Sequence, residues 1–144
     1  MFFTKYKIIF MIKYCNYKMN GEVGRGLHIF LDYVNYKSPV EDDGEWMLNK
    51  LRENVKKSGI REVHSHVEKF DGTKSPPGFA AVILIDESHV TAHCYSEIGL
   101  LAVDVFTCGN NDPQIIVDNL KELFSETIEG IKLVREQKIG RFIK

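Results

Sequence analysis

The sequence of 144 residues lacks an excess of charge of either sign: 19 lysines and arginines stand against 20 aspartates and glutamates, for a formal net charge of −1. Without an overall basic field, the chain has no general attraction for nucleic acid or for anionic lipid. Only five apolar residues separate Lys7 from Lys13 near its start, too few for a membrane span or for the core of a signal peptide. We therefore expect a cytoplasmic protein whose partners include neither nucleic acid nor a membrane.

The contents of cysteine, proline and glycine exclude further classes of protein. The three cysteines, Cys15, Cys94 and Cys108, are an odd number without CxxC spacing, which excludes a disulfide framework and a four-cysteine zinc site. Four prolines and eleven glycines are too few for a disordered or collagen-like chain. A chain of this length and composition is expected to fold as one globular domain.

The N-terminal segment differs from the rest of the chain. Met1 to Asn20 contains four lysines and no acidic residue. It is compatible with an additional edge strand, with a disordered basic arm, or with a start codon upstream of the true one at Met11 or Met19. We expect residues 1–25 to be an extension that contributes little to function, and residues 26–144 to form the single functional domain.

Hydrophobic periodicity predicts an α+β fold for that domain. Met47, Leu51 and Val55 recur every four residues, as on the buried face of a helix. Other apolar stretches alternate or run continuously over the length of a strand, and Gly and Pro residues punctuate the loop at residues 71–78. The expected strands are 26–34, 61–70, 79–85, 88–95, 100–107 and 131–136, and the expected helices begin after Asp42–Asp43 and at Asp112–Pro113. Because neighbouring strands are joined by short turns, this order predicts a two-layer sandwich, in which two helices cover one face of a largely antiparallel sheet.

Side chains with catalytic potential are concentrated on two consecutive strands. Side chains alternate along a strand, so every second residue shares a face. On the first strand these residues are His89, Thr91, His93 and Tyr95. On the second strand they are Asp104, Phe106 and Cys108. With Glu97 between the strands, these groups are expected to converge. A histidine on a half-buried strand more often has a structural, hydrogen-bonded role. His64 and His66 also share a face, but no motif has metal-ligand spacing, and we predict no metal.

A longer string of residues carries a resemblance. Asp86-Glu87-Ser88-His89-Val90-Thr91-Ala92-His93 is followed by Glu97 and Gly99, and then by residues 102–109, AVDVFTCG. This string resembles the prokaryotic S-adenosylmethionine decarboxylases, which are pyruvoyl-dependent lyases of polyamine synthesis made as proenzymes. Their pattern is an ESH(L/V)(T/S)xH strand, a glutamate four residues beyond it, and a strand ending in DxFTCG. The resemblance begins at Gly26-Leu27-His28 and continues to the second helix.

The resemblance implies a self-cleaving proenzyme. The bond between Glu87 and Ser88 would break, and Ser88 would become a covalently bound pyruvoyl group, which forms a Schiff base with the amine of S-adenosylmethionine. His93 matches the base that assists cleavage, and Cys108 matches the proton donor that follows decarboxylation, a role that suits a thiol. The product would be the aminopropyl donor for spermidine synthesis.

The resemblance also implies a binding role for two residues. Glu97 matches a glutamate that accepts hydrogen bonds from the ribose hydroxyls, and Phe70 matches an aromatic residue that stacks on adenine and faces the sulfonium charge. The residues alone leave Glu97 open as a solvated turn carboxylate and Phe70 open as a core aromatic at the end of a strand.

Some positions depart from the family pattern. Ala80 replaces a serine that helps cleavage, a role for which Ser75 or Thr73 would be the substitutes. Tyr95-Ser96 replaces Trp-Pro, and Ile98 and Leu100 replace tyrosines. These changes keep open a pyruvoyl-dependent arginine or ornithine decarboxylase, and also a non-catalytic regulatory paralogue. The family further implies a homodimer of two-chain protomers, in which two helix-covered sheets lie face to face with the active sites near the interface.

Overall fold

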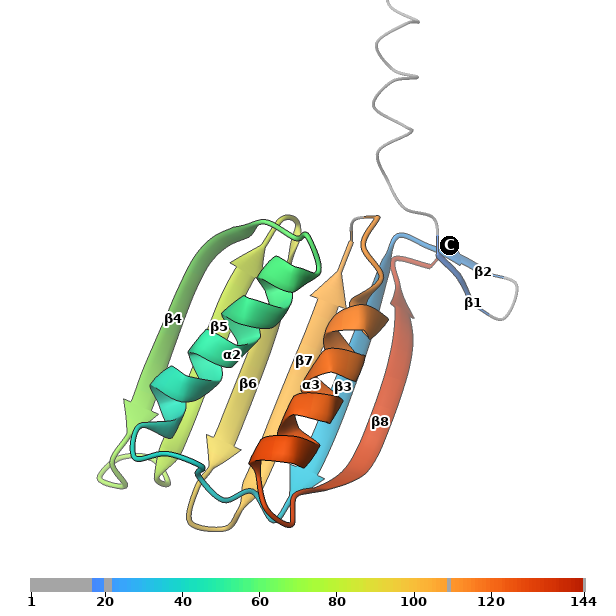
Figure 1. Cartoon of the computed structure of the whole chain (residues 1–144). Helices are drawn as coiled ribbons and strands as arrows, with labels where there is room; N and C mark the ends of the chain where they lie inside the picture. The colour runs from blue at the N-terminus through green and yellow to red at the C-terminus, as the bar shows by residue number, and fades with distance from the viewer. Residues whose placement is uncertain (1–16, 20–21, 109, 144) are drawn as a thin grey trace, which may run out of the picture.

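A six-stranded sheet forms the body of the molecule in a computed structural model that describes residues 17–19, 22–108 and 110–143. The strand order is β4-β5-β6-β7-β3-β8, and every neighbouring pair is antiparallel (Figure 1). Two further strands, β1 and β2, form a separate two-stranded sheet. The elements are β1 Tyr17–Met19, β2 Glu22–Gly24, β3 Gly26–Val34, α2 Asp43–Lys57, β4 Glu62–Phe70, β5 Gly78–Ile85, β6 Ser88–Tyr95, β7 Leu100–Thr107, α3 Pro113–Thr127 and β8 Lys132–Arg141.

Both helices begin where the sequence predicts. The Asp42 carboxylate accepts a hydrogen bond from the backbone amide of Glu45 at 3.2 Å, and the Asp112 carboxylate accepts one from that of Gln114 at 2.9 Å. Each bond satisfies one of the free amides at a helix start. Pro113 occupies the first turn of α3, where it loses no helical hydrogen bond.

The last strand is longer than the sequence predicts. A strand near residues 131–136 with a basic tail is expected, whereas β8 continues to Arg141 because β3 is paired along its whole length, from Gly26 with Arg141 to Val34 with Lys132. β8 is an edge strand, so its charged side chains reach solvent while its backbone still pairs. Hydropathy therefore does not reveal its second half.

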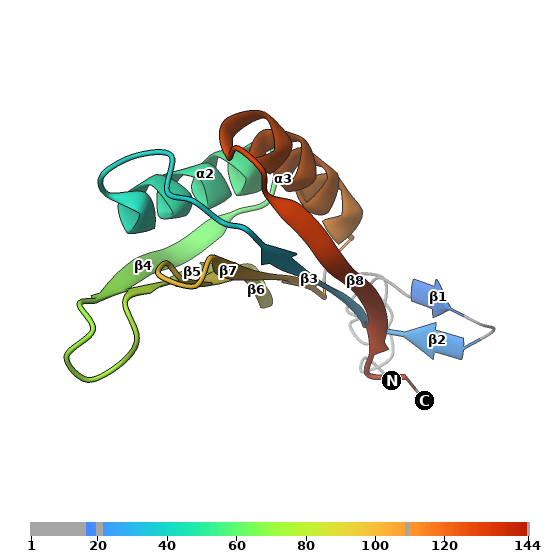
Figure 2. The ribbon, with the colours of Figure 1, turned by 90° about the horizontal axis from the view of Figure 1, so that it is seen from below.

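The two helices lie on one face of the sheet (Figure 2). The core fills the space between the helices and the sheet. Met47 and Leu51 of α2 and Leu120 and Phe124 of α3 are fully buried there. Alternate residues of the central strands point into the same layer, among them Ile29 of β3. The α+β sandwich predicted from the sequence is therefore the fold observed.

The opposite face of the sheet is covered by no described element (Figure 2). We call it the open face. Six large hydrophobic side chains on it are more than a third exposed: Phe70, Leu84, Tyr95, Leu100, Val134 and Ile139. Exposed apolar area of this kind commonly marks an interaction surface.

Of the predicted N-terminal extension, residues 1–16, 20 and 21 lie outside the described residues, as does Cys15. Residues 17–19 pair with residues 22–24 in a hairpin of their own and do not extend the main sheet. Among the described residues, no helix has the length and apolar character needed to cross a membrane.

Candidate active site

The predicted cleavage site lies in the tight turn between β5 and β6. β5 ends at Ile85 and β6 begins at Ser88, so Asp86 and Glu87 alone form the connection. Glu87 has a φ of 65°, in the left-handed region that costs a residue other than glycine on the order of 1–3 kcal/mol. The backbone is therefore strained at the residue whose carbonyl would be attacked.

The Ser88 hydroxyl is buried and unpartnered. Its Oγ has no hydrogen-bond partner among the described residues, although buried hydroxyls are normally paired. By register Ser88 lies opposite Ile85, on the helix-covered face of the sheet. A cleft of about 460 Å³ adjoins the turn, with Glu87, Thr107 and Asn111 among its lining residues. A hydroxyl held without a partner beside a strained peptide fits the precursor of a pyruvoyl group.

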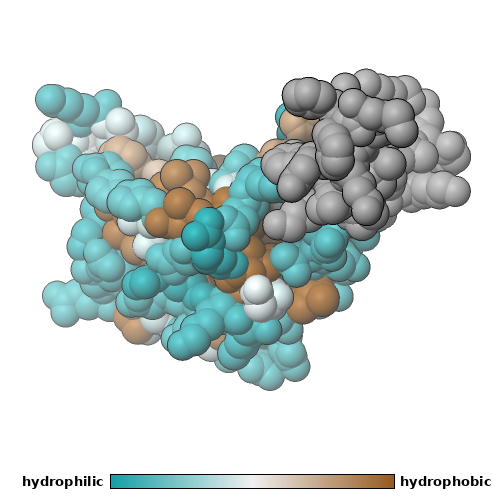
Figure 3. All heavy atoms as spheres, turned by 90° about the horizontal axis from the view of Figure 1, so that it is seen from above, coloured by the Kyte–Doolittle hydropathy of each residue, from teal (hydrophilic) through white to brown (hydrophobic). Residues whose placement is uncertain are grey.

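Cys108 lies at the same end of the sheet, just beyond β7. Gly26, at the start of β3, makes room for it, because a Cβ atom on Gly26 would come within 3.1 Å of the Cys108 Sγ and 2.9 Å of the Phe106 ring. We call this end, which holds Glu87, Ser88 and Cys108, the Ser88 end; it is at the top of Figure 1. Figure 3 looks onto it and shows hydrophobic atoms surrounded by hydrophilic ones.

A histidine–carboxylate pair, His28 with Asp104, lies at the Ser88 end on the open face. His28 Nε2 lies 2.9 Å from Asp104 Oδ1, and Arg141 Nη1 lies 3.3 Å from His28 Nδ1. Because arginine only donates, Nδ1 accepts, and the proton of a neutral His28 is on Nε2 and donated to Asp104. The ring of His89 lies 6.1 Å from that of His28, and both contact Phe106. Burial, followed by the nearby His28, lowers the pKa of His89.

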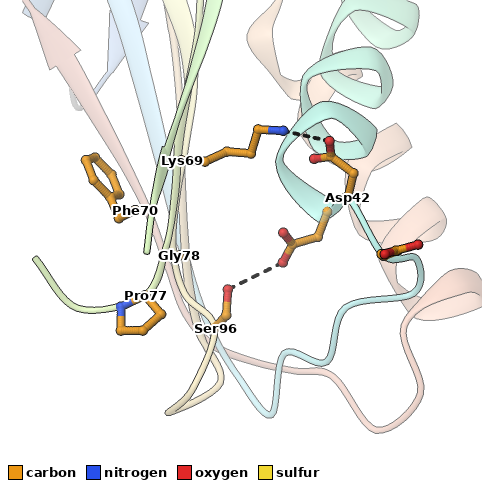
Figure 4. Close-up of a pocket in the computed structure, with 8 residues that line it drawn as sticks. Asp42, Lys69, Phe70, Pro77, Gly78 and Ser96 are labelled. Atoms are coloured by element: carbon orange, nitrogen blue, oxygen red, sulfur yellow. Dashed lines mark hydrogen bonds and ion pairs between the residues drawn. The ribbon is translucent and has the colours of Figure 1, made fainter. Parts of the chain in front are cut away.

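Phe70 and Glu97 lie at the opposite end of the sheet, at the bottom of Figure 1, and we call this the Glu97 end. Phe70 is the last residue of β4 and is 36% exposed on the open face, so it is not the core aromatic that the sequence leaves possible. It lines a cleft of about 490 Å³. In Figure 4 Phe70 points to one side of the strands, whereas Lys69 points to the other and bonds Asp42 at 2.6 Å.

Glu97 belongs to the turn between β6 and β7. It is exposed and makes no hydrogen bond or ion pair with any described residue, so its carboxylate is available to a ligand. The turn itself is fixed at both sides: the Ser96 amide donates to the Pro77 carbonyl at 3.0 Å, and the Tyr36 amide donates to the Gly99 carbonyl at 2.9 Å. The Ser96 hydroxyl also lies 3.4 Å from an Asp43 oxygen (Figure 4).

His93 lies nearer to Glu97 than to Ser88. It points to the open face between Ala80 of β5 and Ala102 of β7, beside a small cavity of about 220 Å³. It is the fifth residue after Ser88 along β6, roughly 16 Å away at strand spacing, and by alternation the two side chains point to opposite faces. Of the groups expected to converge, His89, Asp104 and Cys108 lie toward the Ser88 end, whereas His93 and Glu97 lie toward the other end. Ser88 and Cys108 share one end, and Phe70, His93 and Glu97 share the other.

The comparisons with known proteins agree with this fold. The family model for S-adenosylmethionine decarboxylase matches residues 27–136. The chain belongs to the S-adenosylmethionine decarboxylase family. It is 40% identical to the S-adenosylmethionine decarboxylase proenzyme of Anoxybacillus flavithermus over 76% of this chain and 86% of that protein, and 30% identical to the proenzyme of Thermoplasma volcanium over 83% and 90%.

A solved structure agrees as well. The crystal structure of the adenosylmethionine decarboxylase from Aquifex aeolicus superposes with a TM-score of 0.64 at 28% identity, over 84% of this chain and 93% of that one. These findings confirm the resemblance stated from the sequence and the α+β class. Membership of this family makes the chain a decarboxylase, and the name proenzyme carried by its relatives agrees with the predicted zymogen.

Three features of this family member were not predicted from the sequence. Arg141, in the predicted basic tail, reaches His28 through β8, and the pairing of His28 with Asp104 depends on β3 lying beside β7. Neither has a local signal. The strain at Glu87 does have a local signal in the sequence, because only two residues separate two strand patterns. Of the hydroxyls considered in place of the family serine, that of Thr73 donates to Asp71 at 2.7 Å. The described residues contain no group of three or more side chains arranged to hold a metal.

Proposed function

We propose that this protein is a cytoplasmic proenzyme that cleaves itself between Glu87 and Ser88 and then decarboxylates S-adenosylmethionine. The observation that carries the proposal is the buried, unpartnered Ser88 hydroxyl next to the left-handed backbone of Glu87. Strain in the backbone of Glu87, next to the scissile bond, favours conversion, and a hydroxyl without a competing partner is free to attack the Glu87 carbonyl carbon.

Cleavage is an acyl shift followed by elimination. The Ser88 Oγ bonds to the Glu87 carbonyl carbon, the C–N bond breaks, and the hydroxyl proton ends on the freed amine. A base then removes the Ser88 α-proton, the Cβ–Oγ bond breaks, and Glu87 leaves as a C-terminal carboxylate. The dehydroalanine that remains takes up water and loses ammonia, which produces the pyruvoyl group at the new N-terminus.

In turnover the pyruvoyl ketone supplies an electron sink for loss of carbon dioxide, the chemistry that pyridoxal phosphate supplies elsewhere. Cys108 lies at the same end of the sheet and gives its Sγ proton to the substrate carbon from which carbon dioxide has left. The neighbouring His28–Asp104 pair fixes one wall of this end on the open face.

The remaining site residues come from a second copy of the chain. In one chain the Glu97 end lies about 23 Å from Ser88, the length of the eight residues of β6, too far for one nucleoside substrate to contact both. If two open faces pack about a two-fold axis that crosses the strands, the Ser88 end of one protomer lies over the Glu97 end of its partner. His93 of the partner subunit then approaches Ser88 from the open face, the side opposite to its Oγ, and can serve as the base that removes the Ser88 α-proton.

The open face favours such a homodimer. A sheet buries an apolar face against another layer, and on this side the described part of the chain supplies none. The six exposed hydrophobic residues of the open face would become the contact, together with Phe30 and Phe106. Phe70 and Glu97 would then lie at the margin of the interface, where they hold the adenine and the ribose.

Mass spectrometry and an assay for released carbon dioxide test the proposal. Under denaturing conditions the purified protein is expected to give two fragments, residues 1–87 and a pyruvoyl-bearing 88–144. It should release carbon dioxide from S-adenosylmethionine and not from arginine or ornithine. A precursor that stays intact on long incubation contradicts self-cleavage, whereas cleaved protein that prefers arginine or ornithine contradicts only the substrate.

A further inference from the structure

An arginine outside the family motif forms an ion pair with the turn that carries the cleavage site. Arg61, immediately before β4, donates from Nε to both Asp86 oxygens at 3.1 and 3.0 Å, and from Nη2 to Oδ1 at 2.6 Å. The Asp86 backbone amide in turn donates to the Arg61 carbonyl at 3.2 Å. The turn is thus fixed by main chain and side chain at the residue just before Glu87.

This ion pair is poorly suited to a role in stability. The side chains of Arg61 and Asp86 are 74% and 50% exposed, and exposed ion pairs contribute little to the free energy of folding. Its bidentate geometry fixes the direction of the Asp86 carboxylate as well as its distance, which a single contact does not. The same bonds hold the pKa of Asp86 below its ordinary value, so the pair persists at neutral pH.

Fixing Asp86 also fixes Glu87. The turn has only two residues, so the backbone of Asp86 determines where the strained Glu87 carbonyl lies relative to the Ser88 hydroxyl. Ser88 itself is held by β6, which pairs with both β5 and β7. The attacking and attacked atoms are therefore held by different parts of the sheet, and Arg61, just before β4, sets the position of the less constrained of the two.

We infer that Arg61 is a positioning residue for self-cleavage: its fork on Asp86 holds the Glu87 carbonyl in line for attack by the Ser88 hydroxyl. The inference rests on the cleavage proposed above. It assigns a role in maturation to a surface ion pair at the edge of the sheet.

The test measures the rate at which newly synthesised chain splits, by intact mass, in the wild type and in variants. Small displacements of reacting groups cost large factors in rate, so Arg61→Ala is expected to cleave about tenfold more slowly at an unchanged melting temperature. Arg61→Lys keeps the positive charge but not the bidentate contact, so its cleavage rate should lie between those of the wild type and Arg61→Ala. The swapped pair R61D/D86R restores an ion pair and should recover part of the rate.

The matched control is Arg52→Ala. Arg52 forms a similar exposed ion pair with Glu62, at 3.0 Å, next to Arg61 but without contact to the turn, and its loss should leave cleavage at the wild-type rate. Equal rates for the wild type and Arg61→Ala, or equal slowing by Arg52→Ala, would overturn the role of Arg61 and leave self-cleavage intact. A wild-type chain that never splits would instead overturn the proposed cleavage itself.

Discussion

The two ends of the sheet carry different kinds of chemistry. The Ser88 end combines a strained turn, a buried hydroxyl and a thiol, close to the His28–Asp104 pair. The Glu97 end combines an exposed carboxylate with an exposed aromatic ring that lines a cleft. The first arrangement suits bond breaking and the second suits recognition. Under the proposed function, their separation along β6 means that a motif complete in the sequence forms no complete site within one chain.

The largest effect is expected at the Ser88 end. Ser88→Ala removes the nucleophile, so neither cleavage nor decarboxylation should be detectable by intact mass or carbon dioxide release. Its melting temperature should not fall below that of the uncleaved wild-type precursor, because a buried hydroxyl without a partner stabilises nothing and its removal relieves a cost of about 1–3 kcal/mol. Ser125→Ala, on the outside of α3, is the control and should cleave normally. Cleavage in the Ser88 variant would place the site elsewhere.

Mixing two defective chains tests whether the ends belong to different protomers. Ser88→Ala keeps the Glu97 end, and Glu97→Gln keeps the Ser88 end. Random pairing of equal amounts makes half of the dimers mixed, each with one complete site of two, so about a quarter of wild-type activity should return. Activity no higher than that of Glu97→Gln alone, with mixed dimers demonstrated by mass, would assign the whole site to one chain.

Local structure follows from the sequence far better than the site does. Alternation and tight turns predict β3, β6 and β7 with the observed bounds, because each is a buried strand with clear signals. They also show that His89 and His93 share a face. They do not show that β3 lies beside β7, on which the pairing of His28 with Asp104 depends. The separation of His93 from Ser88, by contrast, already follows from the predicted strand 88–95, because five residues of extended chain span roughly 16 Å.

A smaller effect is expected from substrate recognition at the Glu97 end. Glu97→Gln replaces a charged acceptor by a neutral one, and hydrogen bonds to charged groups contribute about 1.5–3 kcal/mol, so KM for S-adenosylmethionine should rise roughly ten- to a hundred-fold with cleavage intact. Glu129→Gln, at an exposed turn before β8, is the matched control. An unchanged KM would favour an amine substrate without a ribose.

The smallest effect concerns pH at the Ser88 end. Burial lowers the pKa of His89 below its ordinary value of 6.5, the nearby His28 and Arg141 lower it too, and Asp104 opposes them. The unfolded chain therefore binds the proton more tightly, and the free energy of unfolding falls as the pH drops through 6.5. We expect the urea midpoint to fall less between pH 7.5 and 5.5 in His89→Gln than in the wild type. His66→Gln, on the exposed edge strand β4, is the control and should keep the wild-type dependence. The same dependence in all three proteins would show that burial at this end does not disfavour the charged form of His89.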